Sequence, residues 1–133
     1  QQPEEVALAI DAYLKSLKPA PSPHLVNGTL SPVARSGEQV FKKAGCADCH
    51  PAALHTVLQA HDVGTRDRFG QPTRAFDTPT LIELWRTAPY LHDGSAPTVR
   101  DVLAHSNPKS QHGTTSQLNP EQLDDLVEYL LSL

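Results

Sequence analysis

The sequence predicts a mainly α-helical domain with long irregular loops, and three observations support this fold class. Apolar residues recur at helical spacing in several segments, most clearly at the end of the chain. No stretch alternates apolar and polar residues around a tight turn, as a β-hairpin would. The 133 residues include 12 prolines and 7 glycines, so loops must occupy much of the chain. This length suits one domain with a single core.

The first predicted helix covers residues 5–17, and its apolar positions share one face: Val6, Ile10, Tyr13, Leu14 and Leu17. Prolines at alternate positions then predict an extended linker over residues 19–30, in which we expect His24 to be solvated. The second helix begins at Ser31, a capping residue followed by proline, or at Ser36, which forms a capping box with Gln39.

The second half of the chain contains three further predicted helices. Residues 51–77 have no sustained period and are expected to form a loop with at most one helical turn. Thr78 is expected to cap a short helix, TPTLIELWRTA, and Thr98 to cap another, TVRDVLAH. Asn119 caps the last helix and Gln122 completes its capping box. The apolar face of this helix comprises Leu123, Leu126, Val127, Leu130 and Leu131.

Charge and composition exclude two classes of partner. The formal net charge is −4 and the isoelectric point is about 5.9, so the chain presents no basic field for nucleic acid. No apolar run approaches the ~20 residues that cross a bilayer. The sequence has no methionine, so we expect it to be processed after a removed signal or excised from a larger protein.

The most informative motif is C-x-x-C-H, formed by Cys46, Cys49 and His50. This is the pattern by which a c-type haem is attached: two thiols form thioethers, and the adjacent imidazole becomes the proximal iron ligand. A redox disulfide is the first alternative, but the βαβ pattern typical of that motif is missing. Structural zinc is the second, but zinc usually takes four protein ligands. The motif therefore predicts one covalent haem c per chain.

A short internal similarity suggests how the chain is organised. DAYLKSL at residues 11–17 resembles VEYLLSL at residues 127–133, and each closes an amphipathic helix. Two helices can converge on such residues by chance. Alternatively, residues 1–18 are the closing helix of a preceding, similar domain, residues 19–30 are a linker, and residues 31–133 form the domain that carries the motif.

Three segments together resemble a known family: GEQVFKKAGCADCH, FDTPTLIELWRTAPYLHDGSAPTVRDVL and LNPEQLDDLVEYLLSL. They are similar to the C-terminal haem domain of bacterial di-haem cytochrome c peroxidases and their relatives. The resemblance covers about residues 31–133 and implies a class I cytochrome c fold, a periplasmic or otherwise exported location, and a neighbouring haem domain or redox protein as partner. It also implies that Gly37 and Phe41 cross the closing helix near Tyr129.

The sequence departs from this family at the iron, because the family commonly supplies methionine as the sixth ligand. The candidates that remain are a lysine, an open position, or one of His24, His55, His61, His92, His105, His112 and Tyr90. In small cytochromes this ligand arrives from the loop before the last helix. His112 lies seven residues before Asn119, with Gly113 beside it, and is our first choice, while His105 is the second. Two histidine ligands should give a lower reduction potential than histidine and methionine.

Four further residues are candidate haem neighbours. His92 resembles the histidine of the family's PYxHxG loop and is expected near the haem edge. Trp85, Arg86 and Tyr90 precede it and are candidates to reach the propionates or line the pocket, although core packing explains Trp85 equally well. We expect electron transfer as the function and no catalytic residue in this domain. The alternative is an electron-donating or catalytic domain of a peroxidase-like di-haem enzyme.

Overall fold

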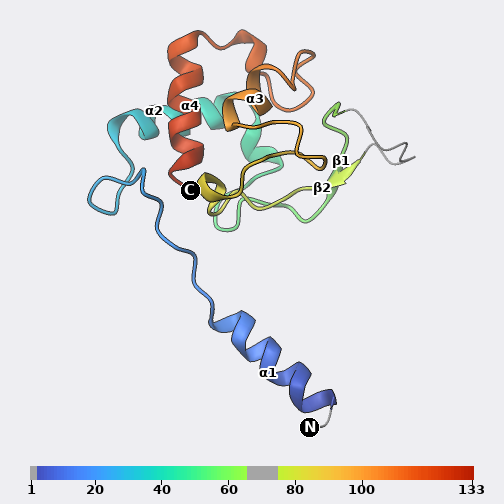
Figure 1. Cartoon of the computed structure of the whole chain (residues 1–133). Helices are drawn as coiled ribbons and strands as arrows, with labels where there is room; N and C mark the ends of the chain where they lie inside the picture. Colours follow the sequence, from blue (N-terminus) through green and yellow to red (C-terminus); the bar gives the residue numbers. More distant parts are fainter. Residues whose placement is uncertain (1–2, 66–74) are drawn as a thin grey trace.

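Two helices that are distant in sequence, α2 (Pro32–Lys43) and α4 (Pro120–Leu131), cross at the centre of the domain (Figure 1). The computed structural model describes residues 3–65 and 75–133. Its other elements are α1 (Pro3–Ser16), η1 (Cys46–Asp48), β1 (Ala60–His61), β2 (Phe76–Asp77), η2 (Leu84–Arg86), α3 (Val99–Ala104) and η3 (Thr115–Gln117). The prediction of a mainly α-helical fold with long loops is confirmed.

The crossing of α2 and α4 is close because Gly37 has no side chain. A Cβ atom at Gly37 would overlap the carbonyl oxygen of Asp125 and would lie 2.8 Å from the Cβ of Tyr129. Four residues further along α2, the ring of Phe41 packs edge-on against that of Tyr129, with ring centres 5.3 Å apart. The buried core around this contact comprises Ala34, Val40, Phe41, Leu81, Val99, Leu103, Leu126, Tyr129 and Leu130.

Local capping signals place three of the helices where the sequence predicts them. The side chain of Ser31 accepts a hydrogen bond from the amide of Ala34, so α2 begins at Ser31 and does not restart at Ser36. Capping boxes are present at Thr98, before α3, and at Asn119, before α4. In each case the capping residue acts on an amide three positions away, which makes the signal readable from the sequence.

The prediction of a helix over TPTLIELWRTA, residues 78–88, is wrong. This segment contains a single 3₁₀ turn, η2, and no α-helix. Glu83 interrupts any longer helix, because its backbone is left-handed (φ 62°) and its amide donates to the carbonyl of Leu133. A second difference is the antiparallel pair β1–β2, which pairs His61 with Phe76 inside the region expected to be loop. The part of that region at residues 66–74 lies outside the described residues.

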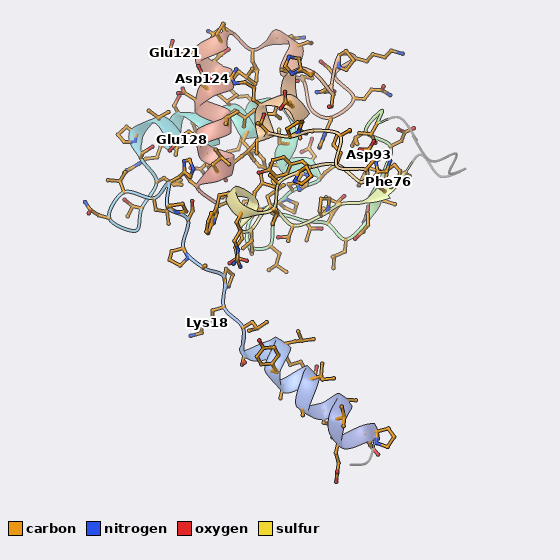
Figure 2. The ribbon with its side chains drawn as sticks, in the orientation of Figure 1. Lys18, Phe76, Asp93, Glu121, Asp124 and Glu128 are labelled. Carbon is orange, nitrogen blue, oxygen red and sulfur yellow. The ribbon has the colours of Figure 1, made fainter. Side chains whose placement is uncertain are left out.

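The helix α1 is separated from the rest of the structure by an extended segment that carries Lys18 (Figures 1 and 2). It has no buried residue. Its large apolar side chains, and that of Leu17 directly after it, are 40–63% exposed: Val6, Leu8, Ile10, Tyr13, Leu14 and Leu17. In an amphipathic helix such a face normally packs against another element.

The segment predicted as a linker is anchored to the domain over its first half. The amide of Ala20 donates to the carboxylate of Glu83 (2.5 Å), and the buried hydroxyl of Ser22 donates to the carbonyl of Leu131 (2.5 Å). The expectation that His24 is simply solvated is wrong, because its half-buried ring contacts the carboxylate of Glu128 at 3.1 Å. Residues 20–24 therefore follow the C-terminal end of α4.

One side of α4 is acidic, with Glu121, Asp124 and Glu128 along it (Figure 2). Asp124 forms an ion pair with Arg100, and Glu128 contacts His24. Within residues 3–65 and 75–133, no helix has the length and apolar character needed to cross a membrane.

Candidate functional site

The end of α2 delivers the C-x-x-C-H motif into the domain. Gly45, with φ 78°, follows the last turn of α2, and η1 then carries Cys46. The amide of His50 donates to the carbonyl of Cys46 at 2.9 Å, so Cys49 and His50 follow within one tight turn. The fold thus brings both thiols and the imidazole to one short stretch of backbone.

The two cysteines do not form a disulfide with each other. Burial raises the pKa of the Cys46 thiol to about 11, so this sulfur is protonated at neutral pH. Reactive redox cysteines have a lowered thiol pKa, which is the opposite of what Cys46 shows. Among the described residues, no three His, Cys, Asp or Glu side chains are grouped to hold a metal ion. The environment of Cys46 therefore does not match that of a redox-active pair.

His50 is buried, with 7% of its surface exposed, and its ring has a fixed orientation. Its Nδ1 lies 2.8 Å from the carbonyl oxygen of His55, which can only accept a hydrogen bond, so Nδ1 carries the proton. This leaves Nε2 as the nitrogen with a free lone pair. Burial lowers the pKa of His50, which favours the neutral imidazole that binds a metal.

The ring of His112 lies near that of His50. Their centres are 6.4 Å apart and their planes are inclined at 36°. Burial lowers the pKa of His112, and the neighbouring His50 lowers it further. The loop of His112 also contacts the motif directly, because the amide of Thr114 donates to the carbonyl of Ala44 at 3.0 Å. Two neutral imidazoles from segments 62 positions apart (50 and 112) thus meet in one place.

Comparison with known proteins identifies the family. The cytochrome c family matches residues 34–133, which include the motif, α2, α3 and α4. The chain belongs to the cytochrome c family. It has the mainly helical cytochrome c fold, its function is electron transfer, and its cofactor is a covalently attached haem c.

Relatives of this cytochrome c domain include much longer proteins. Hydrazine synthase subunit gamma of Kuenenia stuttgartiensis is 31% identical, over 94% of this chain and 48% of that protein. A chain in the structure of Kuenenia stuttgartiensis hydrazine synthase pressurized with xenon matches with a TM-score of 0.80 and 31% identity, over 94% of this chain and 54% of that one. The methylamine utilization protein MauG of Methylorubrum extorquens is 31% identical, over 75% of this chain and 34% of that protein. The chain thus spans about half or less of the length of these relatives.

Two observations show that the residues of this cytochrome c domain fit a haem. The two unpaired cysteines and the free Nε2 lone pair of His50 are the donor set that a c-type haem requires. The indole Nε1 of Trp85 is buried without a hydrogen-bond partner in the described part of the chain, as are Nδ1 of His55 and Nε2 of His61. A buried polar nitrogen without a hydrogen-bond partner lowers the stability of the folded protein. The propionate groups of a haem are hydrogen-bond acceptors and could partner such nitrogens.

Of the other candidate haem neighbours, Arg86 and Tyr90 contact residues of η2, and His92 contacts Phe76 in β2. Arg86 is exposed and pairs with Glu83 (2.6 Å), while its guanidinium carbon lies 5.8 Å from the centre of the Trp85 ring. The hydroxyl of Tyr90 donates to the carbonyl of Leu84 at 2.9 Å, which fixes the loop after η2. His92 is exposed and its ring stacks on that of Phe76, with centres 3.9 Å apart.

Two further residues named from the sequence have clear positions. Phe41 is buried between Tyr129 and His55, and its ring centre is 6.3 Å from that of His55. His105, the second choice for the sixth ligand, ends α3 with Nδ1 2.8 Å from Asp101, and its side chain is 77% exposed. The sequence did not single out Thr114, whose contact with Ala44 requires the folded structure to recognise.

Proposed function

We propose that this chain is a single-haem electron-transfer domain in which Cys46 and Cys49 attach the haem and His50 and His112 are the axial ligands. The observation that carries this proposal is the distance of 6.4 Å between the two ring centres. A metal–imidazole bond is about 2.0 Å long and the bonded nitrogen lies about 1.1 Å from the ring centre, so two imidazoles sharing one metal have centres about 6.2 Å apart. The measured spacing agrees with this value.

The chain's own residues suit electron transfer better than catalysis. A haem bound here supplies a one-electron iron couple. If His50 and His112 both bound the iron, they would leave no open position for peroxide, and peroxidase chemistry also needs a positioned acid or base. The carbonyl of His55 holds Nδ1 of His50 protonated, which fixes the ring and increases the basicity of the ligand nitrogen. Two imidazole ligands and a more basic ligand nitrogen would both favour a low reduction potential.

We further propose that the domain is part of a larger multi-haem protein. The ends of α1 and α4 have similar sequences. In α4 the apolar residues of this segment are buried, and in α1 the residues at the matching positions are exposed: Leu126, Tyr129 and Leu130 in α4 correspond to Ile10, Tyr13 and Leu14 in α1. A helix with this pattern is suited to close a second domain of the same kind, with the segment that follows it as the connection. The redox partner is then a neighbouring haem domain or an external redox protein, and the location is periplasmic or otherwise exported.

The alternative is that the chain is an electron-donating or catalytic domain of a peroxidase-like di-haem enzyme. Its similarity to MauG and to a hydrazine synthase subunit supports an enzymatic parent protein. Within this domain, however, a catalytic role requires an iron position that an exogenous ligand can reach. The same experiment therefore tests both readings.

The test compares His112→Ala with the matched control His105→Ala, after expression with a cytochrome c maturation system. We expect a six-coordinate, low-spin spectrum for the parent chain and for His105→Ala, and slow binding of carbon monoxide. His112→Ala should become high-spin and bind carbon monoxide and cyanide readily. A low-spin His112→Ala protein would contradict the ligand assignment, and ready ligand binding by the parent chain would favour the peroxidase-like alternative.

A further inference from the structure

The buried side-chain amide of Asn107 bonds the loop that carries His112. We propose that Asn107 is a positioning residue that keeps His112 at the iron and so closes this side of the haem to exogenous ligands. The inference rests on the proposed axial role of His112 and extends it to the residue that sets how firmly this position is closed. Asn107 itself is expected to touch neither the haem nor a substrate.

Asn107 forms hydrogen bonds with both backbone polar groups of His112. Its Oδ1 accepts from the amide of His112 at 2.9 Å, and its Nδ2 lies 2.9 Å from the carbonyl oxygen of the same residue. Nδ2 also lies 2.9 Å from the carbonyl oxygen of Gly113 and 2.8 Å from the hydroxyl of Thr115. Because only 3% of Asn107 is exposed, water cannot easily replace these contacts.

The same side chain connects His112 to rigid parts of the fold. The hydroxyl of Thr115 donates to the carbonyl of Leu103, in the last turn of α3, at 2.7 Å. On the other side of the loop, Thr114 donates to the carbonyl of Ala44, directly before the motif. A Cβ at Gly113 would lie 3.2 Å from that carbonyl oxygen and 3.4 Å from the sulfur of Cys46. The loop is therefore held between α3 and the end of α2.

This arrangement predicts a specific effect on the iron rather than a general loss of packing. The residues between Asn107 and His112 form a surface loop, in which Pro108, Lys109 and Gln111 are exposed. Without the amide, the backbone of His112 loses contacts at both its N–H and its C=O. The loop would then open more often, and each opening would separate the imidazole from the iron while the thioethers keep the haem in place.

The test uses the holoprotein and measures carbon monoxide binding to its reduced form after flow mixing. We expect Asn107→Ala to bind carbon monoxide about tenfold faster or more, as loss of several buried hydrogen bonds implies. Thr115→Val, which removes one partner of Asn107 with little change of shape, should show a smaller increase. Ser110→Ala is the matched control, because it also removes a hydroxyl from this loop, one that bonds the hydroxyl and the amide of Ser116 in η3 rather than the backbone of His112. It should leave the rate unchanged.

A second readout separates positioning from stability. Amide hydrogen exchange at His112 and Thr114 should accelerate in Asn107→Ala, whereas exchange in α2 and α4 should change much less. In a double variant with His112→Ala, the substitution of Asn107 should add no further increase in binding rate, because the residue that it positions is already gone.

The outcomes distinguish the two proposals. If His112→Ala becomes high-spin but Asn107→Ala and Thr115→Val bind carbon monoxide at the parent rate, the role of Asn107 is refuted and the axial role of His112 stands. If His112→Ala stays low-spin, the proposed ligand is wrong. An Asn107→Ala protein that merely melts earlier, with parent-like binding and local exchange, would likewise overturn the positioning role.

Discussion

Replacing Gly37 with alanine tests the closest contact in the domain. The new Cβ would sit 2.5 Å from the carbonyl carbon of Asp125, whereas carbon atoms in contact need about 3.5 Å, so α4 must move away from α2 by about 1 Å. The two nearest clashing atoms, the carbonyl carbon and oxygen of Asp125, belong to the backbone and cannot rotate away. Overpacking of this kind typically costs about 1–3 kcal/mol, and a backbone clash belongs at the upper end.

The helix propensity of alanine opposes this cost by about 1 kcal/mol, so the net destabilisation should be about 2 kcal/mol. For a domain of this size the melting temperature should fall by about 10 °C. The assay is thermal unfolding of the holoprotein followed by far-UV circular dichroism. Gly28→Ala is the control: it makes the same chemical change at φ 73° with no atom within 4 Å, and should cost only about 1 kcal/mol. A Gly37→Ala protein as stable as the parent would refute the close crossing.

Two further predictions concern the periphery of the domain. Deleting residues 1–17 should change the free energy of unfolding by no more than about 0.5 kcal/mol, as measured by urea titration, because α1 buries no residue. Hydrogen bonds from Thr98 and His105 hold the pKa of Asp101 in the folded protein below its usual value. The ionised carboxylate therefore stabilises the folded state at any pH above the pKa that Asp101 has in the unfolded chain. This stabilisation is lost as the pH falls through the pKa of Asp101 in the folded protein. Asp101→Asn should therefore lose less stability than the parent between about pH 5 and pH 3, in melts recorded at each pH.

The helices that the sequence predicts correctly are those with local signals. Ser31, Thr98 and Asn119 each cap a helix by bonding an amide three residues away. The two longer of these helices, α2 and α4, also have an apolar face along their length. The C-x-x-C-H motif is also local, since five consecutive positions contain both thiols and the imidazole. These features can be read from the sequence because the atoms that interact are close together along the chain.

The features that the sequence does not reveal depend on partners that are far along the chain. The segment at residues 78–88 has helical spacing, but Glu83 bonds Leu133 and Ala20 and adopts a left-handed backbone. His24 gains its contact from Glu128, 104 positions away. Asn107 has no sequence signal that distinguishes it from an ordinary loop asparagine, because its role depends on how the loop closes around its amide.

One of the two anchors that set the spacing of the imidazoles lies at the end of α2. The helix delivers His50 just beyond Ala44, and the carbonyl of Ala44 accepts from both the amide (3.0 Å) and the hydroxyl (3.3 Å) of Thr114. The position of His112 is therefore defined relative to the same peptide that positions the motif, although 62 positions separate residues 50 and 112. If α2 moves, the rings of His50 and His112 should move together, because both are tied to its end. If only the loop of His112 moves, the two rings separate. Because Asn107 bonds this loop at His112, its hydrogen bonds, rather than the packing of the core, should determine how often the iron becomes accessible.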